Sequence, residues 1–316
     1  MRITVSASPA LRTQFFPDLD RLLALGDVHL VDDHADLPAA LPGTRVLVTS
    51  WGAPALGREL LDLAPELRLL AHTGATVKPF VTGESWARGV RVTQAGAGMA
   101  RSVAEASLAF TLASLYRLQR FDHAMRSGAE WAAASEAPPR HEILGCRIGV
   151  VGASRTGRAY IELVRALGAE VAVHDPYYEG SVGLDELLST SMVVALHAPV
   201  LPETRHMIGA RELALMPDGA MLVNTARSWL VDQEALLAEL RTGRLDAALD
   251  VFDEEPLPTD HPFRRLPNVL LTPHRAAGTV ECYRRLGDIV IGEIGRFAAG
   301  LPLEHEVTAE MLSRMG

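Results

Sequence analysis

The sequence predicts an α/β protein built from two doubly wound parallel-sheet domains separated by a cleft. Three observations lead to this fold class. Short β-branched runs alternate with helical segments, the 316 residues are enough for two hydrophobic cores, and a strand–turn–helix–strand unit lies near the middle of the chain. Each domain is therefore expected to be a parallel sheet joined by crossover helices.

The central unit begins with a β-branched run at 148–151, which predicts a buried strand that breaks at Gly152. Apolar residues at helical spacing then predict a helix over 156–167, and a second strand follows over 170–173. This order of elements within about 30 residues is the context that a dinucleotide-binding fingerprint needs.

The turn inside this unit holds the expected coenzyme contacts. Gly152 permits a sharp turn, Gly157 allows close packing of helix on strand, and the helix N-terminus offers N–H groups to a pyrophosphate. Ser154 replaces the middle glycine of the G-x-G-x-x-G pattern, at the position where the backbone approaches the phosphates. Asp175 ends the second strand, where a carboxylate binds a ribose diol and repels a 2′-phosphate, so the sequence predicts NAD rather than NADP. An ordinary tight turn is the alternative interpretation.

The first part of the chain has the same alternating rhythm. Strands are expected over residues 3–5, 28–31, 46–49, 67–72 and 90–93. Loops that follow such strands are where an open parallel sheet binds its ligand. The loop at 73–76 contains Gly74 and can direct several backbone N–H groups at an anion, although a simple connection would have the same pattern.

A strongly helical segment spans residues 102–118, with Ser102 as its expected N-cap and Glu105 three residues further on. Its apolar residues cover more than one face, which predicts a helix buried between domains or between subunits. Residues 128–142 have no clear period and contain two consecutive prolines, so we expect a surface connection there.

Composition limits the partners of the protein. Apolar residues make up 48% of the chain, and the formal net charge of −9, without a dense run of Lys or Arg, argues against nucleic-acid binding. No segment approaches about 18 consecutive apolar residues and no signal peptide is apparent, so we expect no membrane span and a cytoplasmic protein. Cys146 and Cys282 lack metal-ligand spacing, so reduced thiols and no metal site are expected.

Polar side chains follow the later strands of the predicted sheet. Arg227, Glu255 and His274 come after successive strands expected at 220–223, 247–251 and 269–271. Because the C-terminal ends of parallel strands line one crevice, these three residues are expected to lie together.

This set of residues suits hydride transfer to a carbonyl. Histidine moves a proton near neutral pH, a neighbouring carboxylate raises its pKa and fixes its tautomer, and a guanidinium holds a carboxylate while polarising a carbonyl. Each residue alone has a plain structural alternative. Arg227 could form a surface ion pair, Glu255 could belong to an acidic loop, and His274 could bind backbone.

Motifs along most of the chain resemble those of the D-isomer-specific 2-hydroxyacid dehydrogenases. They are SVAEASLA at 102–109, GASRTG at 152–157, LHAPVLPETRHMIG at 196–209, LVNTARSWLVDQEAL at 222–236, ALDVFDEEPLP at 248–258 and LTPHRAAGT at 271–279. The resemblance implies a Rossmann or flavodoxin-like NAD-binding domain over 100–280. It also implies a substrate domain made of 1–99 and completed by 281–316.

The resemblance also assigns roles to individual residues. Arg227, Glu255 and His274 would be catalytic, with Glu255 supporting the acid–base histidine. With the fingerprint, the coenzyme contacts fall on Gly152, Ser154, Arg155, Thr156, Gly157, Asp175, Pro199, Thr204, Thr225, Ala226 and Asp250. The substrate carboxylate would be held by Thr73, Gly74, Ala75 and Thr76 together with Arg227. Thr76-Val77-Lys78 and Ser228 depart from the family pattern near the pocket and leave the substrate open.

The function expected from these observations is NAD-dependent interconversion of a small D-2-hydroxy acid and its 2-keto acid. One alternative is NAD-dependent oxidation of formate, phosphite or a hydroxyalkylphosphonate. An alternative of another class is an NAD-sensing interaction protein that resembles the transcriptional corepressors of this fold. The expected partners are a small anionic substrate and a second copy of the chain in a homodimer. Trp51 and Trp229 either border the substrate or pack as buried aromatics.

Overall fold

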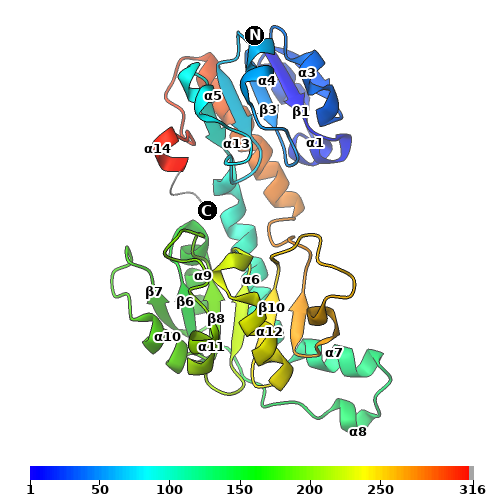
Figure 1. The fold of residues 1–316 in the computed structure, drawn as a ribbon, viewed down its shortest axis with the longest axis vertical. Coiled ribbons are helices and arrows are strands. Elements are labelled where there is room, and N and C mark those ends of the chain that lie inside the picture. The colour runs from blue at the N-terminus through cyan, green and yellow to red at the C-terminus, as the bar shows by residue number, and fades with distance from the viewer. Residues whose placement is uncertain (313–316) are drawn as a thin grey trace. The chain divides into compact units, whose positions relative to one another are not determined.

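The structure, a computed structural model, describes residues 1–312. The chain forms two compact units (Figure 1). The first unit joins Met1–Met99 to the chain from Gly278 onward, and the second unit is Ala100–Ala277. Each unit contains one sheet in which all strand pairs are parallel, which confirms the predicted fold class.

The sheet of the first unit has the strand order β2-β1-β3-β4-β5. Its strands are β1 (Arg2–Ser6), β2 (Asp27–Val31), β3 (Val46–Thr49), β4 (Leu69–His72) and β5 (Arg91–Gln94). Its helices are α1 (Pro9–Phe15), α2 (Asp20–Leu23), η1 (His34–Asp36), α3 (Leu37–Ala40), α4 (Arg58–Leu63), α5 (Gly83–Ala87), η2 (Gly96–Met99), α13 (Val280–Ala298) and α14 (Ala309–Leu312). The five strands lie where the alternating pattern predicted them, with boundaries that differ by one or two residues.

Helix α13 belongs to the first unit although it is distant in sequence. Thr279 caps it by accepting a hydrogen bond from the backbone N of Cys282. A Cβ atom on Gly287 would lie 1.8 Å from the carbonyl oxygen of Phe15, so glycine is needed for α13 to pack against α1. The C-terminal part of the chain therefore completes the first unit.

The sheet of the second unit has the strand order β11-β10-β9-β8-β6-β7. Its strands are β6 (Arg147–Val151), β7 (Glu170–His174), β8 (Val193–Leu196), β9 (Met221–Asn224), β10 (Asp246–Leu249) and β11 (Val269–Leu271). Its helices are α6 (Ala100–Leu115), α7 (Leu118–Arg126), α8 (Trp131–Ala134), α9 (Arg155–Ala166), α10 (Leu184–Thr190), α11 (Ala210–Leu215), η3 (Ser228–Leu230), α12 (Gln233–Thr242) and η4 (Pro262–Arg265). The strand order reverses between β6 and β8, and ligands of open α/β sheets bind at such a point.

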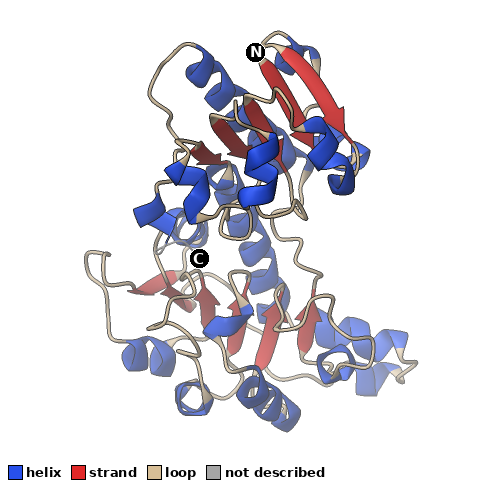
Figure 2. Cartoon of the chain, turned by 45° about the horizontal axis from the view of Figure 1, so that its top comes forward, coloured by secondary structure: helices blue, strands red, loops and turns tan. Residues whose placement is uncertain are grey.

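Alternate residues of β8 show how helices cover both faces of this sheet (Figure 2). Val193 and Ala195 belong to the core formed with α6 and α9. Val194 and Leu196 belong to the core formed with α10, α11 and α12. All four side chains are fully buried, which explains why the strand reads as a continuous apolar run.

The ends of α12 follow the residues that predict them. The Asp232 carboxylate accepts a hydrogen bond from the backbone N of Ala235, and Gly243 ends the helix with a φ of 77°.

The predicted cap of the long helix was wrong. Helix α6 begins at Ala100, so Ser102 lies inside the helix and is buried. The helix also ends at Leu115, because Arg117 has a φ of 56° and turns the chain into α7.

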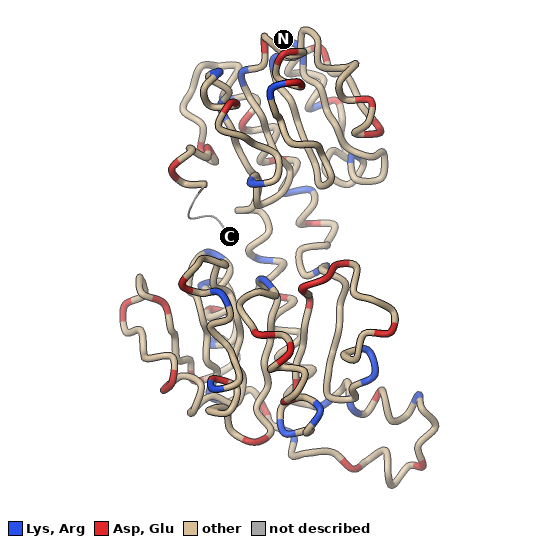
Figure 3. The backbone as a smooth tube through the Cα atoms, viewed as in Figure 1, with Lys and Arg blue, Asp and Glu red and all other residues tan. Residues whose placement is uncertain are grey.

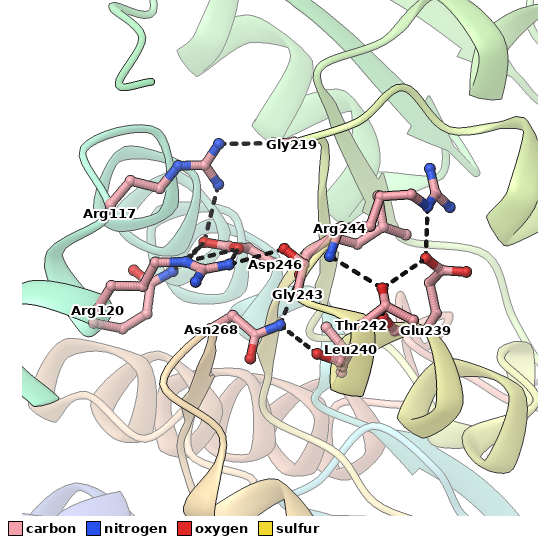
Figure 4. Close-up of polar contacts among 12 residues, drawn as sticks. Arg117, Arg120, Gly219, Glu239, Leu240, Thr242, Gly243, Arg244, Asp246 and Asn268 are labelled. Carbon is pink, nitrogen blue, oxygen red and sulfur yellow. Dashed lines mark hydrogen bonds and ion pairs between the residues drawn. The ribbon is translucent and has the colours of Figure 1, made fainter. Parts of the chain in front are cut away.

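A buried ion-pair cluster holds this corner against the amino end of β10 (Figure 4). The Arg117 guanidinium is fully buried, lies 2.9 Å from the Asp246 carboxylate and donates to the carbonyl oxygen of Gly219 at 2.8 Å. Arg120 and Gln119 donate to the same carboxylate at 2.5 and 2.9 Å. The start of α7 is therefore fixed by tertiary contacts.

Candidate active site

The turn after β6 has the geometry of a dinucleotide-binding turn. Gly152 has a φ of 93°, and a Cβ atom there would lie 2.4 Å from the backbone N of Ala198. A Cβ atom on Gly157 would lie 2.1 Å from the carbonyl oxygen of Gly152. Both positions need glycine, the first for its backbone conformation and close approach and the second for close packing of α9 on β6.

The residues between these glycines lie at the amino end of α9. Ser154 precedes the helix, is exposed, and makes no capping hydrogen bond through its side chain. Arg155 is exposed and Thr156 is half-buried. The N–H groups and dipole of this helix end favour an anion, so the end fits a pyrophosphate, and the exposed serine side chain does not fill the turn.

Asp175 lies beside the same turn. Its Oδ2 accepts a hydrogen bond from the backbone N of Ala153 at 2.7 Å, and its Oδ1 accepts from the backbone N of Tyr177 at 2.8 Å. The backbone therefore fixes the carboxylate at the end of β7. Each oxygen keeps a further lone pair with which to accept a ribose hydroxyl.

The loops after β8 and β9 contain further residues that are predicted to contact the coenzyme. The Thr204 hydroxyl donates to the carbonyl oxygen of Pro199 at 2.6 Å, so these two residues are joined in one loop. Thr225 is buried with its hydroxyl 2.8 Å from that of Ser107.

Asn224 is a functional candidate that sequence reasoning missed. Its side chain accepts from the backbone N of Ala226 at 3.0 Å and donates to the carbonyl oxygen of Arg227 at 2.9 Å. The buried amide thus sets the conformation of the loop that carries the arginine. Its position as the last residue of a strand was the available signal.

Glu255 and His274 form a direct pair. His274 Nδ1 lies 2.7 Å from Glu255 Oε2, while Glu255 Oε1 accepts from the backbone N of Phe252 at 2.9 Å. The carboxylate orients the imidazole and fixes a proton on Nδ1. The His274 side chain is half-exposed, so its Nε2 can face a bound molecule. The sequence prediction placed these two residues together, and they are in contact.

Arg227 is half-buried and follows β9. One of its terminal nitrogens donates to the carbonyl oxygen of Ala226 at 2.7 Å. Burial lowers the pKa of Arg227, and the charge of Glu255 acts in the opposite direction. A guanidinium remains protonated under such conditions, so Arg227 offers its other N–H donors as a fixed positive charge.

Asp250 anchors the loop that carries His274. This carboxylate is buried and accepts hydrogen bonds from the Thr272 hydroxyl and from the backbone N atoms of Arg275 and Ala276, the last two at 2.7 and 2.9 Å. The sequence prediction put Asp250 near the nicotinamide, and that contact stays a prediction. The anchoring role was not predicted, because it depends on backbone groups of a distant loop.

The predicted substrate loop lies in the first unit, after β4. Both the N–H and the hydroxyl of Thr73 donate to the carbonyl oxygen of Thr49, at 2.9 and 3.1 Å, so Thr73 anchors the loop. The carbonyl oxygen of Gly74 accepts from the backbone N of Ala95 at 2.9 Å. Ala75 and Thr76 are half-buried and follow this anchored turn.

The two tryptophans named from sequence are both partly exposed. The Trp51 ring packs on Phe15 and Tyr283 at centroid distances of 5.6 and 6.1 Å. The Arg205 guanidinium lies 4.5 Å from the Trp229 ring centroid, a cation–π contact.

Lys and Arg positions and Asp and Glu positions both occur along the whole described backbone (Figure 3). Among residues 1–312, one group of His, Cys, Asp and Glu side chains has metal-ligand proximity: Glu293, Glu304 and His305. His305 Nδ1 already lies 2.9 Å from Glu293, and Arg296 pairs with Glu304 at 2.7 Å. No helix in the described part of the chain is long and apolar enough to cross a membrane.

The parallel sheet, its glycine turn and the carboxylate after β7 define a dinucleotide-binding protein. Residues 108–276 match the family model described as "D-isomer specific 2-hydroxyacid dehydrogenase, NAD binding domain". The chain belongs to this family of dehydrogenases. The match confirms the predicted family and the predicted cofactor, NAD.

Relatives of known name support the assignment. The chain is 32% identical to a glyoxylate reductase of Korarchaeum cryptofilum over 77% of its length and 76% of that protein. It is 32% identical to a D-3-phosphoglycerate dehydrogenase of Methanocaldococcus jannaschii over 86% of its length and 52% of that protein, so it spans about half the length of that relative. A D-lactate dehydrogenase structure from Treponema pallidum is similar with a TM-score of 0.84 and 26% identity, over 98% of this chain and 100% of that one.

Proposed function

We propose that the protein is an NAD-dependent oxidoreductase that interconverts a small D-2-hydroxy acid and its 2-keto acid. The observation that carries this proposal is the 2.7 Å contact between Glu255 and His274 Nδ1, which leaves Nε2 of a half-exposed imidazole to act as acid or base. Residues 100–280 would bind the coenzyme. Residues 1–99, completed by 281–316, would hold the substrate.

Bound NADH would supply the hydride for the carbonyl carbon of the keto acid. His274 donates a proton from Nε2 to the carbonyl oxygen, and Glu255 stabilises the imidazolium before that transfer. Arg227 binds the carboxylate and polarises the carbonyl, because its planar donors reach two oxygens at once. In the oxidation direction His274 accepts the proton.

The other predicted contacts fit the same scheme. The helix end at Ser154, Arg155 and Thr156 would bind the pyrophosphate, and Asp175 would accept the ribose hydroxyls. The backbone N–H groups of Gly74, Ala75 and Thr76 would hold the substrate carboxylate. Pro199, Thr204, Thr225, Ala226 and Asp250 would border the coenzyme. Asp250 would act there mainly by holding the His274 loop.

The first experiment is a fluorescence titration with NADH and NADPH, followed by a panel of keto acids. We expect preferential binding of NADH, and its oxidation by one or more small keto acids. Tight NADH binding without turnover of any keto acid would direct the search to formate, phosphite and phosphonates. Partner binding that depends on NADH, in a protein without turnover, would favour the sensor alternative.

The His274→Ala variant tests the proposed acid–base group. We expect kcat to fall by about 10²–10⁴-fold, because removal of a positioned general acid has effects of that size. NADH affinity should stay within about twofold, since that measurement reports the coenzyme site alone. Near-native kcat in folded His274→Ala would remove this residue from the mechanism.

We also propose a cytoplasmic homodimer. Leu118, Met125 and Trp131, which lie on α7 and α8, are 54%, 51% and 78% exposed, and exposed apolar side chains gathered on one segment favour a protein partner. Light scattering coupled to size-exclusion chromatography measures the assembly. A monomer at micromolar concentration would contradict the dimer.

A further inference from the structure

The imidazole of His72 lies beneath the 73–76 loop and has no part in the mechanism above. His72 is the last residue of β4 and is fully buried. Its Nδ1 lies 3.0 Å from the hydroxyl of Thr49, and its ring packs on Phe80 at a centroid distance of 4.4 Å. Burial lowers the pKa of His72 to about 4, so the ring is neutral near pH 7.

The other ring nitrogen faces the loop. His72 Nε2 is buried and has no hydrogen-bond partner among the described residues. A Cβ atom on Gly74 would lie 2.5 Å from this nitrogen and 3.1 Å from Nε1 of Trp51. Gly74 therefore rests directly on the imidazole, and any side chain at position 74 would collide with it. Buried polar atoms are normally paired, so an unpaired one at this place needs an explanation.

On the side away from the imidazole, the backbone at 95–96 contacts the same turn. The backbone N of Ala95 donates to the carbonyl oxygens of His72 and Gly74, at 3.1 and 2.9 Å. A Cβ atom on Gly96 would lie 2.8 Å from the Cα atom of Ala75. The turn at Gly74 and Ala75 is thus confined between the imidazole and the backbone of Gly96.

We propose that His72 is a positioning residue for substrate binding, whose imidazole sets the place of Gly74 and so the direction of the N–H groups of Gly74, Ala75 and Thr76. This inference rests on the proposed function, in which these N–H groups hold the substrate carboxylate. Hydrogen bonds weaken steeply as their angle departs from linearity, so a small displacement of the turn lowers affinity for the anion. The chemistry at Arg227 and His274 does not depend on it.

The His72→Phe variant separates positioning from mere structural support. The six-membered ring reaches further toward Gly74 than Nε2 does, and it removes the unpaired nitrogen. We expect the variant to fold with little change in thermal stability, because removal of the unpaired Nε2 opposes the loss of the Nδ1 contact with Thr49 and the closer packing on Gly74. We expect KM for the keto acid to rise about tenfold, with kcat and NADH affinity within about twofold. A folded His72→Phe protein with unchanged KM would overturn the proposal.

A double-mutant cycle tests the contact itself. Gly74→Ala alone should raise KM, because its Cβ atom meets the imidazole. In a His72→Ala background the Gly74→Ala change should raise KM by a smaller factor. The two effects on KM are then less than multiplicative. Gly57→Ala, in the same unit, is the control, because a Cβ atom there meets nothing within 4 Å, and it should leave KM unchanged in both backgrounds. Multiplicative effects for the Gly74 pair would contradict the proposal. The wild type, Gly74→Ala, His72→Ala and the double variant also give a cycle of melting temperatures. This second cycle can be measured without any turnover.

Oxalate binding distinguishes failure of this inference from failure of the proposed function. If the wild type with NADH turns over no 2-keto acid, the proposed function fails. Oxalate affinity in the NADH complex, followed by fluorescence, still reports the loop. His72→Phe should weaken oxalate binding about tenfold in that complex. Equal oxalate affinity in wild type and variant would overturn the role of His72 whatever the reaction is.

Discussion

Backbone N–H groups hold each carboxylate of the candidate site in place. Asp175 accepts from Ala153, Glu255 accepts from Phe252, and Asp250 accepts from the His274 loop. Hydrogen bonds of this kind fix the direction of a carboxylate. The residues that carry charge are therefore oriented before any ligand binds, which lowers the reorganisation that binding and catalysis require.

The charge of Asp175 should decide the choice of coenzyme. In Asp175→Asn the amide oxygen can still accept a backbone hydrogen bond, but the repulsion of a 2′-phosphate is lost. We expect the preference for NADH over NADPH to fall by about tenfold, since a change of about 1.4 kcal/mol in relative affinity has that effect. Titration with both coenzymes measures it. Asp218→Ala, a change at an exposed aspartate of the same unit, is the control and should leave the preference unchanged.

His197 should make the protein sensitive to acid. Its ring is buried against Tyr160, neither ring nitrogen has a partner among the described residues, and burial lowers the pKa of His197 to about 4. The unfolded chain therefore binds a proton that the folded chain does not bind between pH about 6.5 and 4, so stability falls as pH falls through this window and is unaffected above it.

Replacement of His197 by Phe should reduce this acid sensitivity. Without the titrating ring, the slope of unfolding free energy against pH should decrease by up to about 1.4 kcal/mol per pH unit within the window. Urea unfolding at pH 7, 6, 5 and 4.5 would measure the slope. An unchanged slope would mean that the folded protein accepts the proton at this ring. His72 contributes in the same direction, so some acid sensitivity should remain.

At the scale of elements, the corner between α6 and α7 depends on one buried carboxylate. Asp246→Ala would leave the Arg117 guanidinium buried without its partner, and such changes cost about 3–5 kcal/mol. Urea unfolding measures the loss. Asp218→Ala removes an exposed partner of Arg244 and should cost less than about 1 kcal/mol. Equal losses in the two variants would show that the cluster in Figure 4 does not stabilise the corner.

Elements with local signals could be predicted from the sequence, and this corner could not. Asp232 and Gly243 mark the ends of α12 through their own caps. The end of α6 depends on the left-handed conformation of Arg117, which is held by a carboxylate far along the chain. Helix α7, which the sequence reading did not identify, starts from that same corner.

In the candidate site, too, some features could be predicted from the sequence and others depend on tertiary contacts. Glu255 and His274 were predicted to lie together because both follow strands of one parallel sheet, and their side chains are in contact. Asn224 and Asp250 act on the backbone of neighbouring loops. Side chain–backbone contacts of this kind leave no periodic pattern, so the sequence predicts neither anchoring role, and only the place of Asn224 at the end of a strand marks it as a candidate.

At the scale of the whole molecule, each unit has its own hydrophobic core. The first unit has a core around Leu47 and Leu70, and the second has cores on both faces of its sheet. The chain passes between the units after Met99 and again after Ala277. Two cores and two connections favour unfolding in more than one step.

Calorimetry with and without NADH tests this expectation together with the proposed coenzyme domain. At about 100 times its Kd, NADH should stabilise the unit that binds it by about 2.7 kcal/mol, which corresponds to about 5–10 °C for a unit of this size. We expect two transitions, of which NADH raises one. Hydrogen exchange should assign the raised transition to residues 100–277, because ligand protection appears in the cooperative unit that the ligand stabilises. A single transition whose temperature NADH raises would mean that the two units unfold together. Protection confined to residues 1–99 would place the coenzyme site in the first unit and contradict the proposed coenzyme domain.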